Sequence, residues 1–137
     1  MRRPVSNHHR GPFETDFSQR LQSSSGRTGV GQETGRTEMV IVMGTVKLAS
    51  DKLEAAKPAM AKMVAASRAE PGCIAYAYAQ DLLDPAIMHV AEQWKDRAAL
   101  TEHFATPHMA EWRGVMGELG LTGRDLKVFE ADEGSAI

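Results

Sequence analysis

The segment Glu70-Pro71-Gly72-Cys73-Ile74-Ala75-Tyr76 decides how the centre of this chain is organised. Proline followed by glycine ends a helix, because proline lacks the backbone N–H and glycine accepts turn conformations. The residues that follow, 73–80, read Cys-Ile-Ala-Tyr-Ala-Tyr-Ala-Gln, which is typical of a strand. The segment therefore predicts a helix that ends before Pro71 and a strand that begins after Gly72.

The residues before this boundary predict a strand and then the helix. Residues 39–48 are rich in β-branched side chains and are apolar on both faces, so this strand should be covered on both sides. Ser50 is predicted to cap the helix, and Pro58 either kinks the helix or marks its true start. The expected core positions at helical spacing are Leu53, Ala56, Met60, Met63, Val64 and Ser67.

The residues after the boundary predict a hairpin, two helices and a last strand. Residues 86–94 are strand-like and are joined to the preceding strand by the loop 81–85. Asp96 is predicted to cap a short helix, and Thr106-Pro107 to start another, since proline suits the first helical position. Residues 126–131 predict the last strand. The expected inward stripe of the second helix is His108, Trp112 and Met116.

This order of elements predicts an α+β fold. Strand, helix, strand, strand, helices and strand, joined by right-handed crossovers, give a ferredoxin-like βαββαβ antiparallel sheet with helices on one face. Met39, Ile41 and Met43 stay apolar on the other face, and about 100 residues form only a marginal core alone. A homodimer that pairs the open sheet faces is therefore expected.

Composition divides the chain at about residue 38. Residues 1–37 contain six arginines and three acidic residues, whereas residues 38–137 contain ten basic and fifteen acidic residues. The first part has too few aliphatic residues to offset the entropy of ordering it, so it is expected to be a disordered leader. The alternative is that translation begins at Met39. Residues 38–137 are expected to form the folded domain.

Charge, hydropathy and cysteine content exclude several classes of partner. The acidic balance of residues 38–137 gives no attraction for nucleic acid, and no apolar run approaches the ~18–20 residues of a membrane span. The single cysteine, Cys73, suits a reducing compartment. We therefore expect a cytoplasmic protein without nucleic-acid or membrane partners.

From about Met39 to Ala131 the chain resembles the antibiotic biosynthesis monooxygenase superfamily, within the dimeric α+β barrels, and especially its quinol monooxygenase-like branch. The resemblance is carried by Ser67–Cys73 with Tyr76, Asp84-Pro85, Glu92, Trp94, His103 and Thr106-Pro107-His108. It implies a homodimeric oxidoreductase that oxidises a quinol or a small polyphenolic aromatic with O2. It also implies that the reaction needs no metal, flavin or haem, so no cofactor is expected.

Such a reaction needs a base near neutral pKa and a dry aromatic pocket, because a phenolate reduces O2 more readily than a phenol does. The candidate catalytic base is His103, or else His89. The candidate substrate-binding residues are Tyr76, Trp94, Phe104, His108 and Trp112. The structural alternatives are a packed His103, a His89 at the dimer seam, and aromatic rings that only anchor the core.

A metal site is not expected. His103 and His108 are five residues apart across a helix break, which is not the i, i+4 spacing of a zincin. Glu102 or Glu111 could add a carboxylate, but no further ligand is evident.

Glu92 beside Trp94 faces inward and needs a partner, because an unpaired buried charge is costly. The expected partner is a basic residue in an ion pair. The candidates for it are Arg68, Lys95 and Arg97.

Three other functions are compatible with the same fold. A haem-degrading relative is expected to carry an asparagine in its site, and residues 38–137 contain none. A non-catalytic dimeric module could bind a small molecule or take part in a stress response. An isomerase of a signal molecule is the third.

Overall fold

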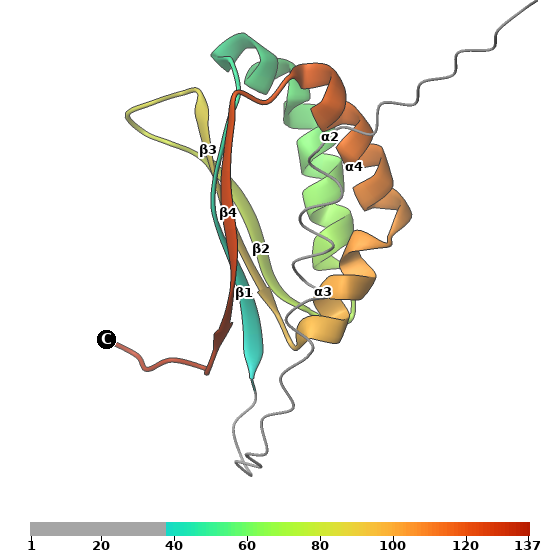
Figure 1. Ribbon diagram of the computed structural model, residues 1–137, viewed down its shortest axis with the longest axis vertical. Coiled ribbons are helices and arrows are strands. Elements are labelled where there is room, and N and C mark those ends of the chain that lie inside the picture. Colours follow the sequence, from blue (N-terminus) through green and yellow to red (C-terminus); the bar gives the residue numbers. More distant parts are fainter. Residues whose placement is uncertain (1–37) are drawn as a thin grey trace, which may run out of the picture. The chain divides into compact units, whose positions relative to one another are not determined.

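The structure, a computed structural model, describes residues 38–137; the predicted leader, residues 1–37, lies outside the described residues. The described residues form four strands and three helices (Figure 1). In chain order the elements are β1 (Met39–Lys47), α2 (Ser50–Arg68), β2 (Cys73–Gln80), β3 (Ile87–Trp94), α3 (Arg97–Phe104), α4 (Pro107–Leu119) and β4 (Gly123–Ala131). No helix in this part of the chain is long and apolar enough to cross a bilayer.

The four strands form one antiparallel sheet in the order β2-β3-β1-β4. β1 is central, and its Val42 lies opposite Glu92 of β3 and Val128 of β4. The neighbours of β1 in the sheet are not its neighbours in sequence, so the helices serve as crossovers. This is the predicted ferredoxin-like α+β fold, which the structure confirms.

The helices cover one face of the sheet (Figure 1). Side chains of a strand alternate between its two faces, and in β1 the buried set is Val40, Val42 and Val46. The helix α2 buries Leu53, Ala56, Met60, Met63 and Ser67. Each fully buried valine, leucine or methionine contributes about 1.5–3 kcal/mol to stability. This contact between α2 and the sheet forms the core on which the site is built.

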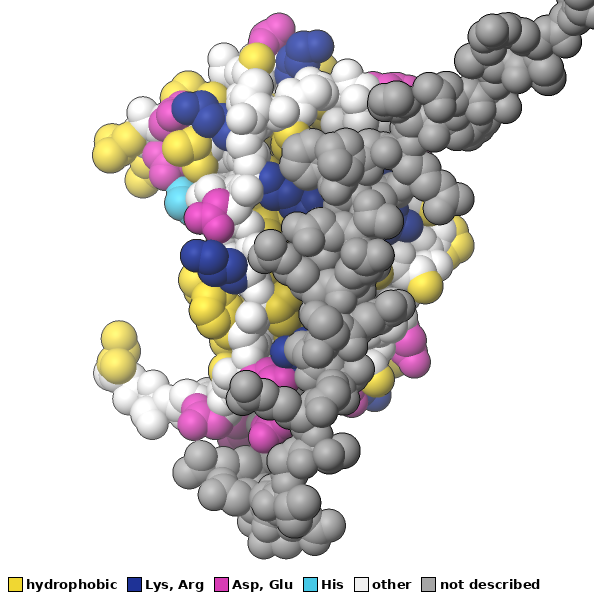
Figure 2. Space-filling view, in the orientation of Figure 1, with side chains coloured by type: hydrophobic (Ala, Val, Ile, Leu, Met, Phe, Trp, Pro, Cys, Tyr) yellow, Lys and Arg dark blue, Asp and Glu magenta, His cyan; other side chains and the backbone are white. Residues whose placement is uncertain are grey.

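The outer face of the sheet remains apolar and exposed in the described chain. Met43 is 55% exposed and Phe129 47%, and Ile41 lies opposite Phe129 on the same face. Figure 2 shows hydrophobic side chains on this side of the sheet, next to charged ones. Large exposed apolar side chains in a group are typical of an interaction surface. The homodimer stays a prediction that this face supports.

Gly44 lets the central strand β1 lie close to β4. Its φ is +153°, and a Cβ built there would lie 1.8 Å from the carbonyl oxygen of Asp125. A residue with a side chain rarely adopts this backbone conformation and would collide with the neighbouring strand. The middle of the sheet therefore requires glycine at this position.

The start of α2 differs from the prediction. Ala49 holds the N-cap position and Ser50 is the first helical residue, without a side-chain cap. Pro58 lies inside the helix, which continues through it. Proline removes the hydrogen bond to the carbonyl of Glu54, and both residues are exposed, so water can replace the missing donor.

The starts of α3 and α4 agree better with the sequence. The carboxylate of Asp96 accepts a hydrogen bond of 2.7 Å from the N–H of Ala99, which confirms the predicted cap of α3. Pro107 begins α4 as predicted. The hydroxyl of Thr106, however, donates to the carbonyl of His103 and does not cap α4. This bond ties the start of α4 to the end of α3.

Two details at the end of the chain were predicted wrongly. The buried residues of α4 are Met109 and Trp112, whereas Met116 is only half-buried. The last strand begins at Gly123 and not at Leu126. Pairing with β1 extends the strand over this polar stretch, which has no strand signal of its own.

Candidate active site

His103 lies on α3 with its side chain fully buried between the helices and the sheet. Its ring centroid is 4.4 Å from that of Trp94 on β3 and 5.4 Å from that of Tyr76 on β2. The ring of Phe104, the next residue in the chain, is 5.6 Å away between centroids. The imidazole is therefore enclosed by aromatic rings that the sheet and its own helix hold in place.

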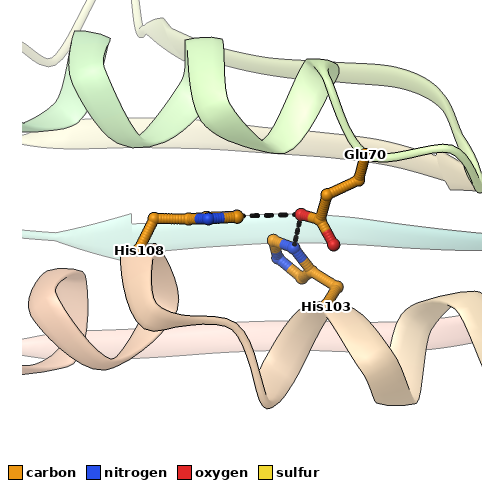
Figure 3. A group of neighbouring side chains, drawn as sticks. All are labelled: Glu70, His103 and His108. Carbon is orange, nitrogen blue, oxygen red and sulfur yellow. Dashed lines mark hydrogen bonds and ion pairs between the residues drawn. The ribbon is translucent and has the colours of Figure 1, made fainter.

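Glu70 connects His103 to His108. Its Oε2 is 2.6 Å from Nδ1 of His103 and 2.9 Å from Nε2 of His108, so both rings meet one carboxylate oxygen (Figure 3). The side chains of Glu70 and His108 are 14% and 20% exposed, against 0% for His103. The cluster therefore runs from a buried ring on α3 to a partly exposed ring on α4.

The turn that carries Glu70 is fixed against α3. Gly72 lies so close to α3 that a Cβ on it would be 2.4 Å from the Cβ of Ala99. The carbonyl of Gly72 accepts from the N–H of Lys95, and the carbonyl of Glu70 accepts from the N–H of Cys73. The helix-ending segment 70–73 thus places a carboxylate beside the helix that carries the histidine.

The hydrogen bond to Glu70 decides where the proton of His103 sits. An ionised carboxylate only accepts hydrogen bonds, so Nδ1 of His103 donates and the neutral ring keeps its lone pair on Nε2. That Nε2 is buried and has no hydrogen-bond partner among residues 38–137. Burial lowers the pKa of His103 below its ordinary value, although Glu70 acts in the opposite direction. The site therefore holds a free basic nitrogen in apolar surroundings.

Tyr76 is also a core residue with a polar end. Its ring is fully buried, and its hydroxyl contacts the sulfur of Met63 at 3.3 Å and the hydroxyl of Tyr78 at 3.4 Å. Burial raises the pKa of Tyr76 far above its ordinary value, so it stays a neutral phenol. Tyr76 thus packs against His103 without adding a charge to the site.

Glu92 lies on the same face, next to Trp94. It is 5% exposed, and its Oε2 accepts a hydrogen bond of 3.0 Å from the indole N–H of Trp94. No cation among the described residues acts on Glu92 in the predicted ion pair, and Arg68 donates instead to the carbonyl of Tyr76. Desolvation raises the pKa of Glu92 to about 7, because no cation replaces the lost water.

His89 does not join this cluster. Alternation along β3 places it on the outer face, opposite to Trp94, where it is exposed. Its Nε2 is 2.7 Å from Oδ2 of Asp81 in the hairpin loop. This hydrogen bond is the main reason why the pKa of Asp81 falls to about 2. The structure separates the two candidate bases by the thickness of the sheet.

The remaining candidates lie at the margin of the cluster. Trp112 contacts Tyr78 at 6.2 Å between centroids, and it lines a shallow hollow of about 40 Å³ between α2 and α4 together with His108. The structure thus brings together five predicted residues with Trp112 at their edge. The five are Tyr76, Trp94, His103, Phe104 and His108.

Glu70 and Tyr78 are the site residues that sequence reasoning missed. Glu70 stands before a helix-ending Pro-Gly, where no local motif marks it as a site residue. Its partner His103 is 33 residues away, and only the fold brings the two together. The alternation of Tyr76 and Tyr78 along β2 was the one available signal for Tyr78, since both lie on one face.

Comparisons with known proteins agree with this fold. Residues 39–115 match the family described as antibiotic biosynthesis monooxygenase. An uncharacterized protein of Synechocystis is 30% identical over 99 residues, which are 72% of this chain and 67% of that protein. A crystal structure from Pseudomonas aeruginosa is 30% identical, with a TM-score of 0.59 over 72% of this chain and 96% of that one. A Deinococcus radiodurans structure named as a candidate antibiotic biosynthesis monooxygenase is 28% identical, with a TM-score of 0.60 over 72% and 95%.

Proposed function

Because the chain belongs to the antibiotic biosynthesis monooxygenase family, we propose that it is a cofactor-independent monooxygenase of a quinol or another small polyphenolic aromatic. The main support is the pair of Glu70 and His103, in which Nδ1 is bound by the carboxylate and the buried Nε2 is free. A neutral imidazole held by a carboxylate is the usual form of a general base.

The proposed reaction takes all its electrons from the substrate. Nε2 of His103 accepts the phenolic proton, and the phenolate passes one electron to O2. In the complete reaction one oxygen atom enters the ring as a hydroxyl group, the other leaves as water, and the quinol becomes a hydroxyquinone. The four electrons that reduce O2 come from the quinol, so no other reductant is needed.

Glu70 stabilises the histidine after it has accepted the proton. The ring then carries a positive charge, and its Nδ1–H bond to Oε2 of Glu70 becomes an ion pair. Hydrogen bonds between charged groups are roughly twice as strong as those between neutral groups. In this role the carboxylate offsets the penalty that burial imposes on a charged His103.

The opening that the structure describes near the cluster is a hollow between α2 and α4, which His108 lines and His103 does not. The hollow beside His108 and Trp112 measures about 40 Å³, which holds at most a few water molecules. An aromatic ring therefore binds only after side chains between α2 and α4 move apart. Tyr76, Trp94 and Phe104 then offer the ring faces on which the substrate stacks.

The proposal includes a homodimer in the cytoplasm. Met43 and Phe129 on the outer face of the sheet supply an apolar surface for the second subunit. The single Cys73 is consistent with a reducing compartment.

Labelled oxygen tests the type of reaction. Metal-free protein is incubated with a reduced naphthoquinone under ¹⁸O2, and the product is analysed by mass spectrometry. A product with one ¹⁸O atom supports the proposal. Plain quinone without the label as the only product, formed with hydrogen peroxide no faster than in buffer alone, contradicts it.

A non-catalytic binding module is the second candidate, because His103, Tyr76 and Trp94 are closed to solvent. A ligand of such a module would raise the melting temperature, as any ligand of the native state does, and would be recovered unchanged.

A further inference from the structure

We propose that Glu70, His103 and His108 form a binding site for a divalent first-row transition-metal ion, for which Zn²⁺ is the best probe. One carboxylate oxygen, Nδ1 of His103 and Nε2 of His108 all lie within 4.8 Å of one another. Figure 3 shows the two rings directed at the same side of the carboxylate. The inference rests on this geometry and on the chemistry of the three side chains.

The fold brings in a third ligand that the spacing of residues in the sequence did not reveal. Glu70 comes from the turn after α2, and the two histidines come from α3 and α4, which only residues 105 and 106 separate. The short break between α3 and α4 rules out the spacing of a zincin, but it lets both rings point toward the same oxygen of Glu70. Their centroids are 5.9 Å apart.

The site needs only a small movement to accept an ion. Ligand atoms around tetrahedral zinc lie roughly 3.3 Å apart, since each zinc bond is about 2.0–2.1 Å long. Oε2 of Glu70 now lies 2.6 Å and 2.9 Å from the two nitrogens, so it must withdraw by under about 1 Å. The side chain of Glu70 is partly exposed, whereas that of His103 is enclosed. The carboxylate is the ligand that moves.

The donor atoms indicate the class of ion. Two imidazoles and one carboxylate are the ligands of open zinc sites and of non-haem iron sites. Calcium and magnesium prefer oxygen donors only. The 20% exposure of His108 leaves a way for the ion to enter and for a water molecule to take a fourth position.

The consequence for catalysis rests on the proposed function. An ion on Nδ1 of His103 occupies the lone pair there, so the proton of the neutral ring moves to Nε2. Nε2 can then no longer accept a phenolic proton. The ion is thus a reversible inhibitor that competes for the catalytic histidine.

The binding experiment uses residues 1–137 with His8→Gln and His9→Gln, which removes the adjacent histidine pair near the start of the sequence. After treatment with a chelator, the protein is titrated with Zn²⁺ by calorimetry and with Co²⁺ by visible absorption. We expect one ion per chain and the absorption of a four-coordinate cobalt site. Glu70→Gln and His108→Gln should each weaken binding at least about 100-fold.

His89→Gln is the matched control, because it removes an imidazole that also faces a carboxylate but lies on the outer face. It should leave the affinity unchanged. Circular dichroism must show that Glu70→Gln and His108→Gln keep the fold. Equal affinity in the parent and in both of these folded variants would overturn the site.

Oxygen uptake with and without Zn²⁺ separates the two proposals. Inhibition by one equivalent that a chelator reverses supports both. Tight binding to a protein that has no metal-free activity keeps the site and contradicts the proposed function. Activity without any Zn²⁺ binding overturns the site alone, and stimulation by Zn²⁺ or Fe²⁺ overturns the inhibitory role.

Discussion

Replacing Glu92 by glutamine is expected to stabilise the protein above neutral pH and to change it little at about pH 4. Glu92 is 5% exposed and its pKa is raised from 4.5 to about 7, mainly by desolvation. In the unfolded chain the same carboxyl group returns to its ordinary value. Between the two values the native state therefore holds a proton that the unfolded state has lost.

The sign and the size of the effect follow from this difference. Where the native state binds more protons, the free energy of unfolding falls as pH rises, here between 4.5 and about 7. Each pKa unit corresponds to about 1.4 kcal/mol, so the total loss is about 3 kcal/mol. Glutamine has the same size and stays neutral, and its oxygen can still accept from the indole of Trp94.

The assay is urea unfolding of the wild type and of Glu92→Gln from about pH 4 to about pH 8. The difference should be near zero at the acid end and reach about 3 kcal/mol in favour of the variant above pH 7. Glu118→Gln makes the same chemical change at an exposed position of α4 and should show no such trend. Parallel curves for wild type and Glu92→Gln would refute the reasoning, because Glu92 would then not hold its proton in the native state.

Three further changes test the fold. Gly44→Ala should lower the free energy of unfolding by about 2–5 kcal/mol in urea unfolding, because the backbone conformation and the contact with β4 both oppose a Cβ. The control Gly117→Ala adds a Cβ into open space and should be neutral or stabilising. Asp81→Asn should lower the melting temperature above about pH 4, because the native pKa of Asp81 is depressed to about 2. The difference from the wild type should fade as the pH falls through that value, and a difference that stays constant with pH would contradict this prediction. Phe129→Lys should turn the expected homodimer into a monomer in light scattering at micromolar concentration, while Glu118→Lys should not; a wild-type monomer would contradict the dimer.

Local signals in the sequence were sufficient for most of the fold. Pro71-Gly72 marks the true boundary between α2 and β2, and Asp96 caps α3 as its position before a helical stretch indicates. Such signals act within a few residues, so they survive in the folded chain. Residues 123–125 carry no such signal and become a strand only through pairing with β1. That pairing is a property of the whole sheet.

The site was predictable only in part, for a related reason. The sequence offers His103 and His89 as alternative bases, and the alternation of side chains along β3 separates His89 from Trp94, which packs against His103. The role of Glu70 depends on a contact across 33 residues. The free Nε2 of His103 depends in turn on that contact, because the carboxylate fixes the proton on the other nitrogen.

Oxygen uptake by metal-free protein with reduced menadione, corrected for uptake in buffer, tests most directly whether His103 is the base of an oxygenase. We predict uptake by the wild type and a decrease of about 100- to 10,000-fold in His103→Gln, which is the usual contribution of a general base. A wild type that consumes no more oxygen than buffer would contradict the account. So would a loss of activity in His89→Gln while His103→Gln stays fully active.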